Sequence, residues 1–139
     1  MRFFLQKNFS MLLFDYAGTG ESSGEFSDIT KEQLAADCKC AMKYCFGKGA
    51  DKNIPVHVLA MRLGCLFAIE TCQENGLPVS SFTLVSPAFN GGQWLKDTIR
   101  RSRFRGGSMS TGIEREDFID IDGFVYGLRF YQSLAESDF

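Results

Sequence analysis

The sequence of 139 residues lacks several features that would place it in a familiar functional class. Its longest apolar run is about five residues, around residues 11–14, whereas a helix needs about 20 to cross a bilayer, so we expect no membrane contact. Its charge is nearly balanced, with 15 basic and 17 acidic side chains and a net charge of −2. No overall field therefore attracts nucleic acid.

Metal ligands are also scarce. The chain has one histidine, and its five cysteines, at positions 38, 40, 45, 65 and 72, are odd in number and lie in helical patterns. This usage favours buried thiols in a reducing, cytoplasmic compartment. The cysteine spacing does not give the two ligand pairs of a zinc site, so we predict no metal and no cofactor. Residues 1–14 have no acids, but residues 6–10, which are polar except for Phe9, interrupt the apolar core that a targeting peptide needs.

What the chain does contain is an alternation of short apolar strands and amphipathic helices. The pattern predicts strands over 10–15, 54–60 and 81–85, with helices over 31–46, 64–74 and the segment after 90–92. Thr30 and Gln33 form a capping box before the first helix, and Asn75-Gly76 suits a left-handed end of the second. The class is α/β, with a parallel sheet of three strands joined by crossover helices.

The tail follows a different pattern. Asp122-Gly123 lies between two alternating runs over 118–126, which is a strong hairpin signal, and a short helix is expected over 128–136. We therefore expect a single domain over 1–139, with the sheet and helices in 1–105 and a cap-like hairpin and helix in 106–139.

Two glycine-containing turns follow predicted strands. The turn from Asp15 through Gly18 and Gly20 to residue 24 lacks the lysine of a phosphate-binding Walker loop, and its last glycine comes one residue late for a dinucleotide loop. Nucleotide binding there remains an alternative, which predicts thermal stabilisation by a nucleotide that is lost in Gly20→Val. The second turn, residues 60–64, passes sharply from strand to helix as a G-x-S-x-G elbow does, with Arg62 at its centre.

These motifs carry a family resemblance. DYAGTGESSGEF over 15–26 resembles the D-x-x-G-x-G-x-S-x-G segment after the fourth strand of α/β-hydrolases. Residues 56–64 look like their fifth strand and nucleophile elbow, and LVSPAFNGGQWL looks like the exit from the sixth strand. The chain is most similar to the exosortase-associated hydrolase-like proteins, which have a similar Arg-Leu-Gly elbow, and roughly residues 4–135 take part. The resemblance implies a truncated α/β-hydrolase-like domain.

The departures from that pattern decide the functional expectation. Arg62 cannot act as a nucleophile because its guanidinium stays protonated and only donates hydrogen bonds. His57 lies five residues upstream, roughly 16 Å away along a strand, and is expected to be a packed core residue rather than a base. The resemblance also implies missing strands, including one between the strands over 10–15 and 56–60. Either a partner chain supplies that strand, or the two strands pair directly, or the gene product is truncated.

Arg62 suits a different chemistry. At a helix amino terminus, free N–H groups, the helix dipole and a guanidinium all favour a carboxylate or phosphate. The alternative is an ion pair between Arg62 and Asp15 or Glu21. The predicted binding residues, with no catalytic or metal residue among them, are Arg62, Leu63, Gly64, Asp15, Gly18 and Gly20.

We therefore expect a non-catalytic hydrolase-like protein, a pseudoenzyme, that acts as an anion-binding or subunit-interaction module. Its expected partners are a second copy or another chain that completes the sheet, and a small anionic ligand. The alternative is an ester or thioester hydrolase, or an acyl transferase, completed by another chain. Cys65 in the helix is a weaker nucleophile candidate, because no histidine accompanies it. The basic run at 96–105 is expected to pair with the acidic run at 114–122.

Overall fold

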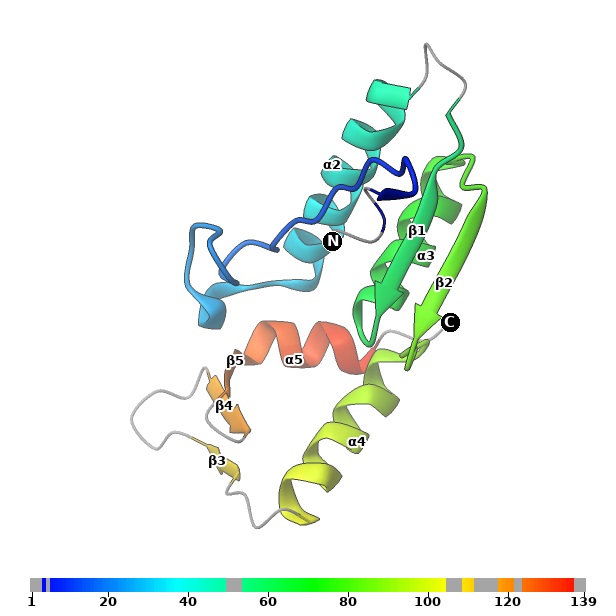
Figure 1. The fold of residues 1–139 in the computed structure, drawn as a ribbon. Helices are drawn as coiled ribbons and strands as arrows, with labels where there is room; N and C mark the ends of the chain where they lie inside the picture. The colour runs from blue at the N-terminus through cyan, green and yellow to red at the C-terminus, as the bar shows by residue number, and fades with distance from the viewer. Residues whose placement is uncertain are drawn as a thin grey trace.

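A computed structural model describes residues 4, 6–49, 54–104, 109–111, 118–121 and 124–136 of the chain. The elements are a short 3-10 helix η1 (Phe26–Asp28), α2 (Lys31–Gly49), β1 (His57–Met61), α3 (Gly64–Asn75), β2 (Ser81–Val85), α4 (Gly91–Phe104), β3 (Met109–Thr111), β4 (Phe118–Ile121), β5 (Phe124–Gly127) and α5 (Leu128–Ala135). Figure 1 shows their arrangement. The α/β class, the small parallel sheet, the C-terminal hairpin strands and the last short helix are confirmed.

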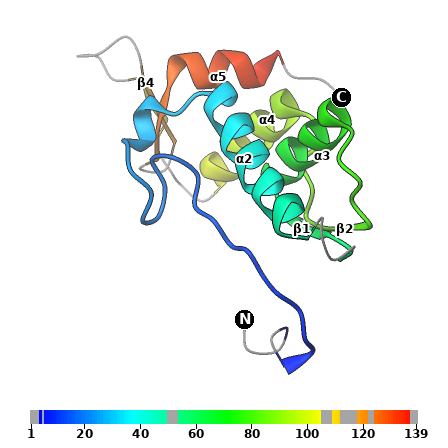
Figure 2. The ribbon, with the colours of Figure 1, turned by 90° about the horizontal axis from the view of Figure 1, so that it is seen from above.

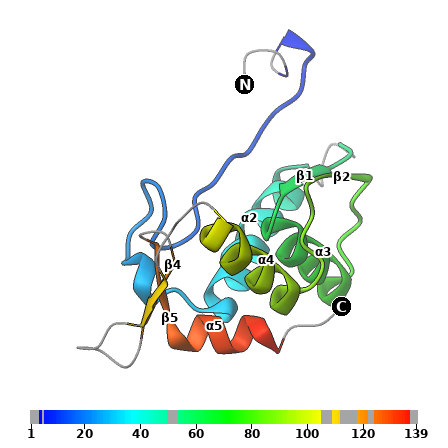
Figure 3. The same cartoon turned by 90° about the horizontal axis from the view of Figure 1, so that it is seen from below.

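The parallel sheet consists of β1 and β2, joined by the crossover helix α3. Their register runs from His57 opposite Ser81 to Met61 opposite Val85. Helices α2 and α3 lie on one side of this sheet, and Figures 2 and 3 show no described element covering the other side. A parallel sheet normally has both faces covered. Here one face of the sheet is left open by the described elements.

The local signals in the sequence set the ends of two helices. The Thr30 hydroxyl accepts a hydrogen bond of 3.1 Å from the Gln33 amide at the start of α2. The Gln33 side chain bonds Asp37 instead of returning to Thr30, so half of the predicted capping box forms. At the end of α3, Gly76 has φ 57°, and its amide donates to the carbonyls of Cys72 and Gln73, as a left-handed cap does.

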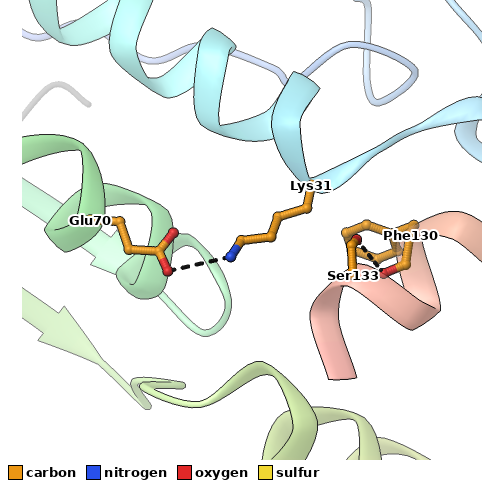
Figure 4. A network of polar contacts seen from close by, with 4 residues as sticks. All are labelled: Lys31, Glu70, Phe130 and Ser133. Carbon is orange, nitrogen blue, oxygen red and sulfur yellow. Dashed lines mark hydrogen bonds and ion pairs between the residues drawn. The ribbon is translucent and has the colours of Figure 1, made fainter. Parts of the chain in front are cut away.

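The core lies between α2, α3 and α5. The predicted apolar face of α2 is buried at Leu34, Cys38 and Met42, and it packs against α3. An ion pair of 3.6 Å between Lys31 and Glu70 joins the same two helices, as Figure 4 shows. The figure also shows the Ser133 hydroxyl donating to the Phe130 carbonyl within α5.

The predicted strand over 10–15 is not a strand. This segment, called here the N-terminal arm, is extended but has no ladder partner among the described residues, so the sheet has two strands rather than three. Phe9 meets the ring of His57, at the start of β1, and Tyr16 meets Phe67 of α3, just past the end of β1. Phe9 thus lies on the open face of the sheet and Tyr16 on the side of α3, and Figures 2 and 3 show the arm running at a steep angle to the sheet. The arm therefore does not pair with β1, and a strand needs such a neighbouring backbone.

Two further expectations are corrected. His57 is exposed on the open face, where its Nδ1 lies 2.7 Å from the Ser81 hydroxyl, so it is not a core residue. Cys40 is exposed and Cys45 half-buried, whereas Cys38, Cys65 and Cys72 are buried as expected.

The C-terminal part forms a second sheet, in which β4 pairs antiparallel with β3 and β5. Strand β3 was not expected from the sequence. The Asp122-Gly123 turn lies outside the described residues, as do Arg105 of the basic run and most of the acidic run.

No helix in the described part of the chain is long and apolar enough to cross a bilayer.

Candidate functional site

The elbow at residue 62 is present. Strand β1 ends at Met61 and α3 begins at Gly64, so only Arg62 and Leu63 separate strand from helix. Arg62 has φ 52°, a left-handed conformation that is uncommon for a residue with a side chain. Its amide donates to the Val85 carbonyl at 3.0 Å, and its carbonyl accepts from the amides of Cys65 and Ala88. These three bonds fix the strained backbone and place Arg62 at the carboxyl edge of the sheet.

The small residues of the elbow contribute unequally. Ala60 is buried beneath the turn, as the close approach of strand and helix requires. A Cβ atom on Gly64, however, would come no closer than 3.9 Å to the Tyr16 hydroxyl, which is an ordinary contact. The tight turn therefore depends on Ala60 and the conformation of Arg62, and Gly64 is not sterically required.

A second strained residue lies beside the elbow. Ser86, directly after β2, has φ 47°, and Pro87 follows it. Strained non-glycine residues persist where the surrounding structure holds them, and they cluster at functional sites. Both corners at the carboxyl edge of the sheet are thus held in unusual conformations.

An open groove of about 470 Å³ lies at these corners. Its lining comes from the end of β1, the segment after β2 and the first turns of α4. The lining residues are Met61, Arg62, Val85, Ser86, Pro87, Ala88, Phe89, Asn90, Gln93, Trp94, Asp97 and Arg101. The volume is within the range of small-molecule sites, and most of the lining surface is apolar.

The charges of the groove favour an anion. Arg62 forms no ion pair with any described carboxylate, so the predicted pairing with Asp15 or Glu21 is absent from the described residues. Asp97 is engaged, because its carboxylate lies 3.0 Å from Arg100. Arg101 donates through Nε to the Asp97 carbonyl at 3.2 Å. The groove therefore holds two guanidinium groups and one carboxylate that already has a cation.

An aromatic cluster borders the groove beside Arg62. Trp94 packs edge-to-face on Tyr126 of β5, with ring centroids 6.4 Å apart, and Tyr126 stacks on Phe130. Burial raises the pKa of the Tyr126 phenol, and the positive charge of Arg62 opposes part of that rise. Tyr126 of β5 therefore lies near the elbow. The Trp94 indole Nε1 is buried and has no acceptor among the described residues.

The glycine turn after the arm has a structural role. The Asp15 carboxylate accepts the Glu21 amide at 3.2 Å, and Gly18 and Gly20 have φ 70° and 53°. Valine at Gly20 would be strained at φ 53° and would displace the Asp15 carboxylate from the Glu21 amide, so Gly20→Val would disturb this turn whatever it binds. Asp15, Gly18 and Gly20 do not line the groove, and neither do Leu63 and Gly64. Of the predicted binding residues, only Arg62 lines it.

Tyr16 connects this turn to the elbow, a role that the sequence did not reveal. Burial, followed by the nearby thiol of Cys38, raises the pKa of the Tyr16 phenol well above its usual range. The next residue, Ala17, donates its amide to the Asp37 carboxylate of α2 at 2.8 Å. The turn is therefore held against both α2 and the first turn of α3.

The described residues do not assemble a catalytic triad. His57 lies at the start of β1, at the opposite end of the strand from Arg62, and its ring contacts Phe9 and Ser81. Cys65 is completely buried, and burial raises the pKa of its thiol, which disfavours the nucleophilic thiolate.

Sequence reasoning missed most of the groove. Gln93, Trp94, Asp97 and Arg101 lie on α4, and the sequence marked this segment only as a helix and a basic run. The spacing of Trp94, Asp97 and Arg101 at i, i+3 and i+7 places them on one face, which was the available signal.

Comparisons with known proteins add no relative. No family model matches the chain, and a search of curated proteins finds no match. Within the described residues, no group of three or more His, Cys, Asp or Glu side chains is arranged to hold a metal ion.

Proposed function

We propose that this chain is a non-catalytic, α/β-hydrolase-like protein that binds a small organic anion in the groove at Arg62. The observation that carries the proposal is the position of Arg62, a permanent cation at a strand-to-helix corner that forms no ion pair with a described carboxylate. Holding arginine in a left-handed conformation costs roughly 1–2 kcal/mol. A residue retained there at that cost suggests a role for its side chain.

The lining of the groove favours an anion with an apolar part. The guanidinium groups of Arg62 and Arg101 would bind a carboxylate or phosphate, for which arginine offers paired donors. The side chains of Met61, Val85 and Phe89 would contact an aliphatic or aromatic group attached to it. A charge-assisted hydrogen bond contributes about 1.5–3 kcal/mol net, so the open groove predicts binding in the millimolar to high micromolar range.

Calorimetric titration tests this proposal with acetate, butyrate, benzoate and phenyl phosphate as ligands. We expect butyrate and benzoate to bind more tightly than acetate, and Arg62→Gln to weaken binding at least tenfold. Arg129→Gln, which removes an exposed arginine outside the groove lining, is the matched control and should leave affinity unchanged. Equal weakening by both variants, or no binding of any ligand, would contradict the proposal.

The alternative function is an ester or thioester hydrolase or acyl transferase completed by another chain. The elbow geometry supports it, because a βα corner of this type presents the central residue for chemistry in hydrolases. Incubation with a serine-directed fluorophosphonate and an ester hydrolysis assay separate the two functions. Covalent labelling of this chain would overturn the non-catalytic proposal.

The proposal includes a protein partner that completes the parallel sheet. Its support is the open face of β1 and β2 and the extended arm, which has the composition of a buried strand. Since three cysteines are buried as free thiols, we also propose a reducing, cytoplasmic location.

A further inference from the structure

The groove at Arg62 has two positive charges that no described acid neutralises. Arg62 and Arg101 both line it, and neither forms an ion pair with a described carboxylate. Among the described lining residues, Asp97 has the only carboxylate, and Arg100, which lies outside the lining, holds it at 3.0 Å. The Asp97–Arg100 pair is therefore neutral as a unit. A ligand that matches the remaining charge of the groove would carry two negative charges.

The first of these charges lies where α4 begins. Arg62 is at the carboxyl edge of the sheet, and its carbonyl accepts the amide of Ala88, in the segment that leads into α4. Tyr126, which lies near Arg62, packs on Trp94 in the first turn of α4. Figure 1 shows this helix beginning beside the ends of β1 and β2 and running away from them. Arg62 is therefore at the sheet end of the groove.

The second charge lies further along the same helix. Arg101 follows Trp94 by seven residues, which is about 10 Å along the axis at about 1.5 Å per residue. Its Nε donates to the Asp97 carbonyl at 3.2 Å, so the side chain folds back toward the turn of Asp97. Since Asp97 comes three residues after Trp94, the Arg101 guanidinium lies roughly 5–10 Å beyond the level of Trp94. A carboxylate held by Arg62 would leave Arg101 free for a second acidic group.

The remaining lining indicates what could join the two acidic groups. Met61, Val85 and Phe89 line the groove with exposed apolar side chains. A short aliphatic chain packed against them would remove apolar surface from water, which favours binding. The groove, at about 470 Å³, has room for such a chain and both acidic groups.

We propose that the groove binds a dicarboxylate or a similar dianion with a short aliphatic chain, with one acidic group at Arg62 and the other at Arg101. This inference rests on the proposed anion binding at Arg62, and it assigns the two arginines to separate acidic groups of one ligand. Each guanidinium offers paired donors to one carboxylate. Arg101 is then the residue that selects a dianion over a monoanion.

Calorimetric titration of the full chain with glutarate and butyrate tests this assignment at about pH 7.5, where the carboxyl groups of both acids are ionised. We expect glutarate to bind at least tenfold more tightly than butyrate. Arg101→Gln should remove that advantage and change the affinity for butyrate by less than about twofold. Arg103→Gln is the matched control, because Arg103 is an exposed arginine of the same helix that lies outside the groove lining. This control should preserve the advantage of glutarate.

The outcomes separate this inference from the anion site on which it rests. If glutarate bound no more tightly than butyrate, the dianion would be refuted, whereas butyrate binding that depends on Arg62 would leave the anion site in place. Equal weakening of both ligands by Arg101→Gln would also refute it, because one carboxylate would then bridge the two arginines. Loss of the advantage in Arg103→Gln as well would indicate a general charge effect instead of a second subsite. Absence of binding by either ligand would remove the anion site and the inference together.

Discussion

Replacing Arg62 with glycine should make the protein more stable and abolish anion binding at the same time. Glycine relieves the left-handed conformation at φ 52°, which costs arginine roughly 1–2 kcal/mol. It also adds about 0.4–1 kcal/mol of unfolded-state entropy that folding must overcome. The three backbone hydrogen bonds of residue 62 remain. The net gain in the free energy of unfolding is therefore about 0–1.6 kcal/mol with a midpoint of about 0.8 kcal/mol, which corresponds to roughly 2–5 °C in Tm at the midpoint.

Thermal unfolding, followed by circular dichroism with and without benzoate, measures both effects. Lys43→Gly is the control, because Lys43 is exposed in the middle of α2, where glycine costs about 1 kcal/mol and lowers the Tm. Opposite shifts in the two variants are expected, and benzoate should stabilise Lys43→Gly but not Arg62→Gly. If Arg62→Gly lowered the Tm as much as Lys43→Gly does, residue 62 would not have the left-handed conformation, and the strand-to-helix turn described here would be incorrect.

Three further predictions concern packing and titration. Gly91→Ala should destabilise the protein by about 1–3 kcal/mol in urea unfolding, because a methyl group there would overlap the Leu134 carbonyl. Gly47→Ala, in α2, where an added methyl group would meet nothing outside its own helical turn within 4 Å, should instead stabilise the protein by roughly 0.5–1 kcal/mol, and equal effects of the two changes would contradict this packing. One thiol should react fastest with Ellman's reagent and be lost in Cys40→Ser, since Cys40 is the exposed cysteine; an unchanged fast phase would refute this. Burial raises the pKa of the Cys38 thiol, so its contribution to stability is complete below the ordinary thiol pKa of about 8.5 and is lost as pH rises above it. Urea unfolding between pH 7.5 and 10 should give a shallower decline in Cys38→Ala, and an identical decline would count against the buried, neutral thiol.

Part of the site followed from the sequence because it depends on neighbouring residues. The small residues Ala60 and Gly64 around Arg62, between a strand and a helix, predicted the corner, and the structure has it, although Gly64 is not sterically required there. The alternative ion pair between Arg62 and Asp15 or Glu21 is absent from the described residues, and the Asp15 carboxylate accepts the Glu21 amide of its own turn. The groove was not predicted, since its wall is a face of α4 whose position depends on packing against α5.

The sequence by itself predicted the four longer helices, the left-handed cap after α3, half of the cap before α2, and the elbow. Helical hydrogen bonds and caps such as Thr30 with Gln33 or the Gly76 turn form within a few residues, so their signals are local. Only the tertiary structure decided that residues 10–15 form no strand and that His57 is exposed, because both outcomes depend on which backbone or layer lies beside them. A strand shares its hydrogen bonds with a neighbour, and burial of a sheet face requires a second layer. The described fold offers no backbone partner to residues 10–15 or to the free edge of β1. The arm therefore stays unpaired although it has the composition of a strand.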